Sequence, residues 1–230
     1  MSEIKIRQAT ENDLPDLLHI DEEIWPNFRA SEGVLRSRIG IFPRGQLVAA
    51  VEEKVVGSLF TLRINYAEWE GRNFSWNEIT DSGTFRTTNR SDGTDLYGVG
   101  LAVLKKFQGK GMGIADRLMI GAGRIVFQKN LRAIYLGARM PGYHKHLGIN
   151  PEEYIASRRN GRSIDPEIHL YESAGFSIVK LLPNYVIDQP SSNLGVLMVR
   201  RNPFGKISGF TLGKIVGACS EELLGRFLNI

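Results

Sequence analysis

The sequence Gln108-Gly-Lys-Gly-Met-Gly113 joins an apolar segment, Asp95–Lys106, to a run with helical spacing that begins at Ile114. Three glycines in six residues allow successive backbone N–H groups to turn toward one point, and a helix N-terminus adds partial positive charge there. Glycine is concentrated around this loop, since eight of the 25 glycines lie between residues 93 and 123. The stretch therefore predicts an anion cradle between a strand and a helix.

Two common nucleotide-binding loops are excluded by residue type. A P-loop needs Ser or Thr directly after its Gly-Lys pair, whereas Lys110 is followed by Gly111 and Met112. The dinucleotide fingerprint Gly-x-Gly-x-x-Gly starts at neither Gly109 nor Gly111. The anion that this loop holds is thus predicted to belong to another kind of ligand.

Outward from the loop, the chain alternates between strand-like and helix-like segments. The expected strands are Ile4–Ile6, Gln46–Glu53, Lys54–Ile64, Asp95–Lys106, Ala133–Leu136, Phe176–Ile187 and Val196–Val199. The expected helices follow Thr10 and Ser31 and cover Ile114–Phe127, Pro151–Asn160 and Asp165–Gly175. Strands at both ends with helices between them, and no flexible linker, predict one α/β or α+β domain over residues 1–202.

Residues 65–95 are polar but contain the large aromatic side chains Trp69, Phe74, Trp76 and Phe85. A connection of this length without structure of its own is unusual. It is either a surface excursion anchored by its aromatics or a loop that folds over a ligand.

Residues 203–230 form a separate extension. Apolar residues recur there at spacings of three and four, which predicts one amphipathic helix. The helix either packs on its own domain or serves as a homodimer contact or a lid. Cys219 lies in the apolar stripe and reads as a core residue.

Composition limits the function further. The 230 residues are 42% hydrophobic with a net charge of +4, which is typical of a globular protein and too weakly basic to indicate nucleic-acid binding. A single cysteine, no secretory pattern at the N-terminus and no apolar run of membrane-spanning length predict a cytoplasmic protein without a membrane partner. His144-Lys-His146 lacks the further ligands of a zinc site, so no metal is expected.

The loop matches the pattern Gln/Arg-x-x-Gly-x-Gly/Ala and resembles the coenzyme A pyrophosphate loop of the GCN5-related N-acetyltransferase family. Two further family marks occur in order, Ile6-Arg-Gln-Ala-Thr-x-x-Asp-Leu-Pro15 and Leu170-Tyr-Glu-x-x-Gly-Phe176. The resemblance covers roughly residues 4–200. It implies a three-layer fold with a mixed, mostly antiparallel sheet of about seven strands, and acetyl-CoA or another acyl-CoA as donor.

The resemblance also implies which residues bind the donor. The N–H of Val103 would face the acyl carbonyl, and Leu101 and Ala102 would pair with the pantetheine arm like an added strand. The expected donor site comprises Leu101, Ala102, Val103, Gln108, Gly109, Lys110, Gly111, Met112, Gly113 and Ile114.

Tyr171 matches the family tyrosine that protonates the departing sulfur. Glu78 is the first candidate for the base that deprotonates the acceptor amine, because it lies in the aromatic segment expected to border the acceptor; His144, His146 and His169 are alternatives. The expected acceptor-binding residues are Trp76, Arg139 and Tyr143.

A narrower likeness joins the chain to acyltransferase domains fused to carbon-nitrogen hydrolases and to similar domains that start polyketide chains. It rests on motifs such as Trp76-x-Glu-Ile-Thr80, Arg139-Met-Pro141 and Leu182-Pro-Asn-Tyr185. Three functions follow as alternatives: acyl transfer to a small-molecule amine, decarboxylation or acyl transfer involving an acyl carrier protein, and acyl-CoA sensing without catalysis. Because the polyketide branch carries histidine at the position of Tyr171, the resemblance favours amine transfer.

Overall fold

The computed structural model describes residues 3–109 and 111–203 of the chain. Its main sheet consists of β1 (Ile4–Gln8), β2 (Gln46–Val51), β3 (Lys54–Ile64), β4 (Asp95–Val103), β5 (Ala133–Arg139), β8 (Ser177–Leu182) and β9 (Gly195–Arg201). A small hairpin is formed by β6 (Arg158–Arg159) and β7 (Arg162–Ser163). The helices are α1 (Leu14–Ile24), α2 (Glu32–Ile41), α3 (Trp76–Thr80), α4 (Ile114–Gln128), α5 (Pro151–Ala156) and α6 (Pro166–Ser173).

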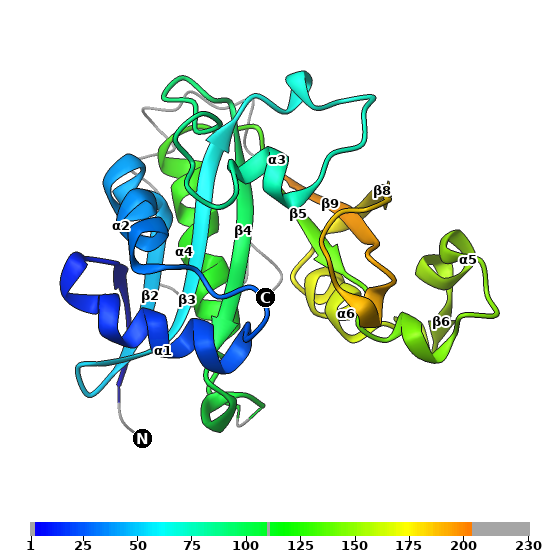
Figure 1. Cartoon of the computed structure of the whole chain (residues 1–230), viewed down its shortest axis with the longest axis horizontal. Helices are drawn as coiled ribbons and strands as arrows, with labels where there is room; N and C mark the ends of the chain where they lie inside the picture. Colours follow the sequence, from blue (N-terminus) through cyan, green and yellow to red (C-terminus); the bar gives the residue numbers. More distant parts are fainter. Residues whose placement is uncertain (1–2, 110, 204–230) are drawn as a thin grey trace.

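The seven strands lie in the order β1-β2-β3-β4-β5-β9-β8 (Figure 1). All neighbours are antiparallel except β4 and β5, which run parallel at the centre of the sheet. The expected mixed, mostly antiparallel sheet is confirmed.

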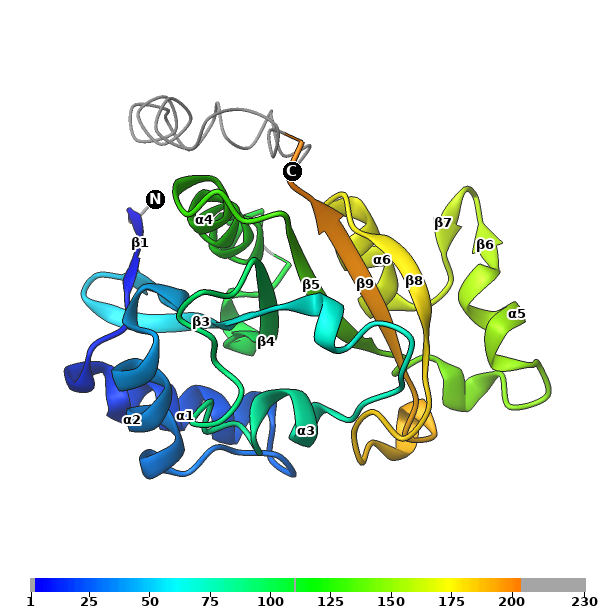
Figure 2. The same ribbon diagram turned by 90° about the horizontal axis from the view of Figure 1, so that it is seen from above.

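Helices cover both faces of this sheet. Figure 2 shows α1, α2 and α3 on one face and α4 and α6 on the other. Leu17 and Ile20 of α1 and Leu118 of α4 are fully buried, and burying each such side chain stabilises the fold by about 1.5–3 kcal/mol. The molecule is therefore a three-layer sandwich with a core on each side of the sheet.

Helix-capping residues mark the helix boundaries that the sequence predicted. The Ser31 hydroxyl accepts a hydrogen bond from Val34 N (3.4 Å) at the start of α2. The Asp165 carboxylate accepts bonds from the N–H groups of Glu167 (3.0 Å) and Ile168 (3.2 Å) at the start of α6. These contacts satisfy N–H groups that the first helical turn leaves unpaired.

The expected helix Pro151–Asn160 is wrong in its second half. Helix α5 ends at Ala156, and the chain then forms the β6–β7 hairpin through Asn160 (φ 53°) and Gly161 (φ 76°). Asn-Gly is the sequence that two-residue hairpin turns prefer, because both residues tolerate positive φ.

Two expected strands are shorter than predicted. β4 ends at Val103 rather than Lys106, because Lys105–Phe107 forms a 3₁₀ turn. β8 ends at Leu182 rather than Ile187, and Asn184 follows with a positive φ of 53°. The residues released from β8 belong to a long β8–β9 loop.

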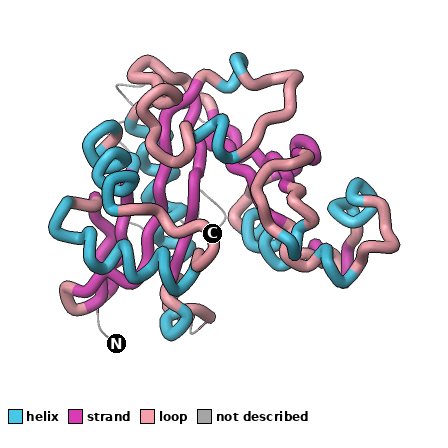
Figure 3. The backbone as a smooth tube through the Cα atoms, viewed as in Figure 1, coloured by secondary structure: helices cyan, strands magenta, loops and turns pink. Residues whose placement is uncertain are grey.

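The polar segment between β3 and β4 consists largely of loops with the short helix α3 (Figure 3). Phe74 and Phe85 are buried in the main core, so the expected aromatic anchoring is confirmed. Trp69 packs edge-on against Phe74 with ring centroids 5.3 Å apart. Helix α3 is thereby held against the body of the protein.

The expected C-terminal helix, with Cys219 and the proposed dimer contact, lies outside the described residues. Within residues 3–109 and 111–203, no helix is long and apolar enough to cross a membrane.

Candidate active site

Strands β4 and β5 diverge in the middle of the sheet. β4 pairs with β3 along its whole length, whereas its parallel pairing with β5 covers only Leu96–Gly98. A β-bulge accompanies the divergence, because the ladder with β3 skips Val99 between Gly98 and Gly100. Bulges often redirect a strand beside a functional site. The divergence opens the sheet beside residues 99–103.

The backbone of Val103 faces this opening. The N–H of Leu104 donates to Val56 O on β3 (2.9 Å), and successive strand residues direct their backbone groups to opposite sides. Val103 therefore directs its N–H and C=O away from β3. Its carbonyl accepts a hydrogen bond from Gln108 Nε2 (2.6 Å), which fixes the start of the glycine loop to the end of β4.

The glycine loop has the backbone that an anion cradle requires. Gly109, Gly111 and Gly113 have φ values of 66°, 67° and 62°, and a side chain at Gly109 or Gly111 would meet no atom within 4 Å. Such left-handed backbone is readily adopted only by glycine. Gly113 is the N-cap of α4, and Ile114 anchors the helix start in the core. The arrangement fits a polyphosphate, with open space in front of the glycines.

Two other residues of the expected donor site do not add to this cradle in the described structure. Met112 is half-buried against the core, and Lys110 lies outside the described residues.

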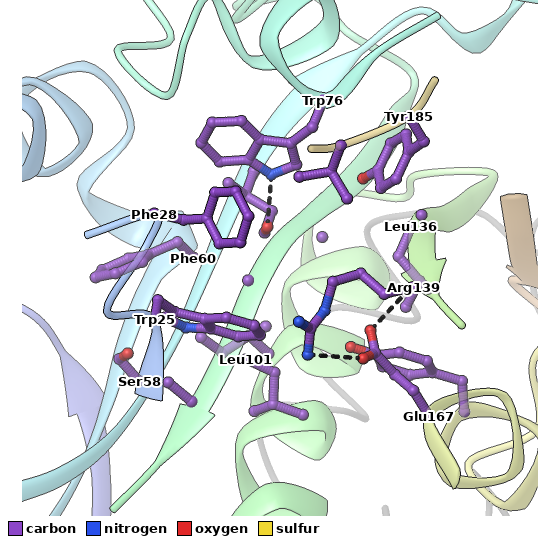
Figure 4. A pocket seen from close by; sticks show the side chains of 18 of the residues that line it. Trp25, Phe28, Ser58, Phe60, Trp76, Leu101, Leu136, Arg139, Glu167 and Tyr185 are labelled. Carbon is purple, nitrogen blue, oxygen red and sulfur yellow. Dashed lines mark hydrogen bonds and ion pairs between the residues drawn. The ribbon is translucent and has the colours of Figure 1, made fainter. Parts of the chain in front are cut away.

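A cavity of about 380 Å³ lies in the opening between β4 and β5, and its lining comes from both faces of the sheet. Leu101 and Ala102 line it from β4. On the α1–α3 side its wall is aromatic; the rings are those of Trp25, Phe28, Phe60 and Trp76 (Figure 4). The opposite wall is more polar and is formed by Arg139, Glu167, Tyr171 and Tyr185.

Arg139 and Glu167 form the charged pair of this polar wall. The guanidinium of Arg139 lies 3.2 Å from the Glu167 carboxylate, which also accepts a hydrogen bond from the Arg139 backbone N–H (3.0 Å). A second carboxylate, of Asp188, lies 3.4 Å from the guanidinium. In Figure 4 the Arg139 side chain extends across the cavity toward Trp25, whose ring centroid is 4.6 Å from Arg139 Cζ.

Burial raises the pKa of Glu167 above the ordinary value for glutamate, and Arg139 opposes the shift. The Glu167 side chain is 17% exposed. A carboxyl group with a raised pKa is a more effective base near neutral pH than a solvated one. The cavity thus contains a held carboxylate suited to accepting a proton.

Tyr171 lies one turn beyond Glu167 on α6 and also lines the cavity. Its pKa is raised by burial and by the charge of Glu167. The phenol therefore stays protonated across the physiological range. Its ring packs edge-on against Phe176 with centroids 5.8 Å apart, so the position of the hydroxyl is restrained.

Tyr185 is placed beside them by two glycines. A Cβ at Gly137 would lie 2.1 Å from the Tyr185 ring, and one at Gly195 would lie 2.5 Å from it. The Tyr185 hydroxyl shares a hydrogen bond with the buried Tyr97 hydroxyl (2.8 Å). Glycine at both positions leaves the space that this ring occupies.

The residues predicted to bind the acceptor divide into two groups. Trp76 and Arg139 line the cavity, and Trp76 Nε1 donates to the carbonyl of the bulge residue Val99 (3.0 Å). Tyr143 is buried elsewhere and donates its hydroxyl to Ile149 O (2.9 Å).

The structure does not bring Glu78 to the cavity. Its carboxylate accepts hydrogen bonds from Ser75 N (2.7 Å) and Ser75 Oγ (2.8 Å) at the N-terminus of α3. These bonds lower the pKa of Glu78. The spacing Ser75-x-x-Glu78 is that of a capping box, so the sequence did contain a signal for this structural position.

The structure also shows where the alternative histidine bases lie and whether metal-binding side chains gather. His144, His146 and His169 are not part of the cavity wall, and His144 Nδ1 lies 2.8 Å from Pro141 O. Within the part of the chain that the structure describes, no three metal-binding side chains gather.

Sequence reasoning missed Arg38, Glu167 and Tyr185, all of which line the cavity. Two of them carried a signal. Glu167 precedes Tyr171 by four residues and thus shares a face of the predicted helix, and Tyr185 ends the motif Leu182-Pro-Asn-Tyr185.

Several solved structures share this fold, with a sheet that splays at its parallel pair, a glycine loop after β4 and helices on both faces. The loading domain of CurA from Lyngbya majuscula superimposes with a TM-score of 0.77 at 22% identity, covering 86% of this chain and 98% of that one. The decarboxylase GphF, solved with isobutyryl-CoA, gives a TM-score of 0.68 at 23% identity over 86% of this chain and 98% of that one. These likenesses show the fold.

Sequence comparison shows the family. No family model matches the chain. It is 30% identical over 209 residues to the uncharacterized N-acetyltransferase YkwB of Bacillus subtilis, covering 88% of this chain and 91% of that one. The chain belongs to the GCN5-related N-acetyltransferase family.

A second relative is longer. The chain is 30% identical over 189 residues to the probable hydrolase YhcX of Bacillus subtilis, which covers 81% of this chain but 36% of that protein. The chain therefore spans about a third of YhcX.

Proposed function

We propose that the protein transfers an acyl group, in the first instance acetyl, from coenzyme A directly to the amine of a small molecule. The observation that carries the proposal is the cavity between β4 and β5, which is lined by Leu101 and Ala102, the two residues of β4 directly before Val103, and by the side chain of Tyr171. Membership of an acyltransferase family supports the reaction class.

The donor would lie along β4 with its polyphosphate on the glycine loop. Leu101 and Ala102 would pair with the pantetheine arm, because β5 leaves that edge of β4 unpaired within the described sheet. The N–H of Val103 would donate to the acyl carbonyl oxygen and stabilise the negative charge that develops there.

Bond formation joins the acceptor nitrogen to the acyl carbon, and the carbon–sulfur bond breaks. Tyr171 donates its proton to the leaving thiolate. An alkyl amine with a pKa of about 10 must lose a proton before it attacks. We assign this step to Glu167 rather than Glu78, because Glu167 lines the cavity with a raised pKa.

The aromatic wall supplies the acceptor site. Trp25 and Trp76 line the cavity together with the half-exposed Phe28, which lies at 39% exposure near its rim. Arg139 and Trp25 contact each other across the cavity, which narrows it on the acceptor side. An amine attached to an apolar body fits this surface better than a polar amine.

The test uses the full chain, acetyl-CoA and a panel of primary amines. We expect acetyl-CoA to raise the melting temperature, and we expect acylated amine and free coenzyme A to form in equal amounts. No thermal shift with any acyl-CoA, together with no product, would contradict the proposal.

The likeness to the CurA loading domain and GphF favours a second candidate, decarboxylation of malonyl-CoA or acyl transfer to an acyl carrier protein. Incubation with malonyl-CoA, with and without an amine, distinguishes the two candidate functions. Release of carbon dioxide without an amine would support the second candidate, and coenzyme A release only with an amine would support the first. A non-catalytic acyl-CoA sensor would bind the donor and show neither reaction.

A further inference from the structure

Arg38 of α2 places a buried positive charge on the acceptor side of the cavity. The residue is 5% exposed and lines the cavity close to the aromatic wall. A buried charge is costly unless it is paired and hydrogen-bonded. Its contacts therefore indicate whether the protein alone satisfies it.

The described residues satisfy Arg38 only in part. Its Nε donates to Gly83 O (2.8 Å), and its guanidinium carbon lies 5.1 Å and 5.4 Å from the ring centroids of Phe60 and Phe85. Among residues 3–109 and 111–203, no carboxylate lies within ion-pair distance of it. Asp21 is the acid that acts on it at longer range.

The pKa of Arg38 shows that nearby carboxylates compensate its burial only in part. Burial lowers the pKa of Arg38 to about 10, and the charge of Asp21 opposes this shift only in part. The Asp21 carboxylate is itself engaged by the N–H of Ala30 (2.9 Å). At neutral pH the guanidinium is charged and its terminal nitrogens keep donor capacity for a ligand.

The charged residues around the cavity are unequal in sign. Its lining includes the acids Asp21 and Glu167, and the bases Arg29, Arg38, Arg139 and Arg200. Glu167 already pairs with Arg139, and Arg29 lies 3.7 Å from Glu22. Asp188 also lies 3.4 Å from Arg139. An anion near Arg38 would thus meet a guanidinium that has no carboxylate within ion-pair distance among residues 3–109 and 111–203.

We propose that the acceptor is an amino acid with an apolar side chain, whose carboxylate binds Arg38 and whose side chain packs on the aromatic wall. This inference rests on the proposed function and names its substrate class. Planar guanidinium matches a carboxylate with two parallel hydrogen bonds. The amino group of the same molecule is then the nucleophile, its proton passes to Glu167, and the coenzyme A thiolate leaves with the proton of Tyr171.

The first experiment compares acceptors with and without the carboxylate, at equal concentrations of the unprotonated amine. With wild-type protein and acetyl-CoA, kcat/KM is measured for phenylalanine, phenylalaninamide and phenethylamine, and for leucine and 3-methylbutylamine. A hydrogen-bonded charge pair predicts a preference for each amino acid of roughly ten- to hundred-fold. Equal kcat/KM values for the acids and the uncharged analogues would overturn the inference while leaving the proposed function intact.

The second experiment assigns the preference to Arg38. Arg38→Met should raise KM for phenylalanine and remove the preference, with KM for phenethylamine and the thermal shift by acetyl-CoA unchanged. Arg38→Lys should restore part of the preference. The matched control is Arg36→Met on the same helix, because Arg36 is 47% exposed and pairs with Glu32 at 2.8 Å. An equal loss of kcat/KM for phenylalanine and phenethylamine in Arg38→Met would indicate a structural role and contradict the assignment.

A binding measurement separates this inference from failure of catalysis. In the presence of coenzyme A, N-acetylphenylalanine should raise the melting temperature of the wild-type protein more than N-acetylphenethylamine does. Equal shifts would overturn the carboxylate site whether or not turnover is seen. Failure of every acyl-CoA to bind would instead remove the proposed function.

Discussion

Arg139 and Glu167 form an ion pair of 3.2 Å that joins the end of β5 to α6 at the edge of the cavity. The backbone N–H of Arg139 holds the same carboxylate (3.0 Å), so both the position and the orientation of Glu167 are fixed. The arginine also contacts Trp25 on the opposite wall. One pair of residues therefore connects the proposed base to the acceptor site.

The first prediction concerns this carboxylate. Glu167→Gln keeps the shape of the side chain but removes its ability to accept a proton, and kcat should fall by about 100-fold or more. In the wild type, burial raises the pKa of Glu167. Activity should therefore decline as pH falls through a value above the ordinary glutamate pKa of about 4.3, because protonation removes the base. Measuring kcat/KM as a function of pH shows where activity declines on the acid side.

Glu78→Gln provides the comparison, because Glu78 caps α3 and is not part of the cavity wall. Its activity and the pH dependence of its activity should match the wild type, with little change in stability, because glutamine can also fill the third helical position of a capping box. If Glu78→Gln abolishes activity while Glu167→Gln does not, the assignment of the base is reversed.

The second prediction concerns the proton donor. Tyr171→Phe removes the hydroxyl and should lower kcat by about 100-fold or more, with acetyl-CoA affinity nearly unchanged. Steady-state kinetics and thermal shift with acetyl-CoA check the two parts. Tyr143→Phe removes a buried hydroxyl that bonds to Ile149 O away from the cavity, and its kcat should stay within a factor of two or so. Equal activity of Tyr171→Phe and the wild type would remove Tyr171 from the mechanism.

The glycine loop gives the third prediction. Gly113 has a φ of 62°, a conformation that costs a residue with a side chain about 1–2 kcal/mol. Gly113→Ala should therefore shift the free loop to other conformations and weaken acetyl-CoA binding by about 5- to 30-fold. Calorimetric titration measures the affinity. Unchanged affinity would show that this backbone does not shape the donor site.

The fourth prediction concerns stability. Gly137→Ala would place a Cβ 2.1 Å from the Tyr185 ring, so Tyr185 must move and its hydrogen bond to Tyr97 is lost. We expect a loss of about 1–3 kcal/mol in the free energy of unfolding. Gly148→Ala is the control, because a Cβ there meets nothing within 4 Å. Denaturant unfolding of both variants compares the effects, and equal stability would mean that Tyr185 has room to shift.

Local sequence signals predicted most of the fold. Alternating apolar residues, the Ser31 and Asp165 caps, and the glycine loop each depend on neighbours within one turn or strand, which a sequence shows directly. The hairpin at Asn160-Gly161 carried such a signal as well, although the helix prediction overrode it. Local chemistry was therefore sufficient for most strand positions and for the donor loop, whereas the arrangement of the strands in the sheet was implied by the family resemblance.

The acceptor side was predictable only in part. Trp76 and Arg139, expected from the family motifs, line the cavity, whereas Arg38 and Glu167 were not expected there. Arg38, Glu167 and Arg139 come together from α2, α6 and β5 around one cavity, and charged residues on helices ordinarily face solvent. Glu78 was misassigned for a different reason. Its position in an aromatic-rich segment suggested a site, although the spacing Ser75-x-x-Glu78 already indicated a helix cap, and the residue is not part of the cavity wall.

The most direct test of the central claim is a stoichiometry measurement. The full chain is incubated with acetyl-CoA and an amine panel that includes apolar amino acids, and mass spectrometry follows acylated amine and free coenzyme A together. We expect the wild type to form both products in equal amounts and Tyr171→Phe to form strongly reduced amounts of both. Binding of acetyl-CoA without any acylated amine, or carbon dioxide release from malonyl-CoA in the absence of an amine, would contradict it.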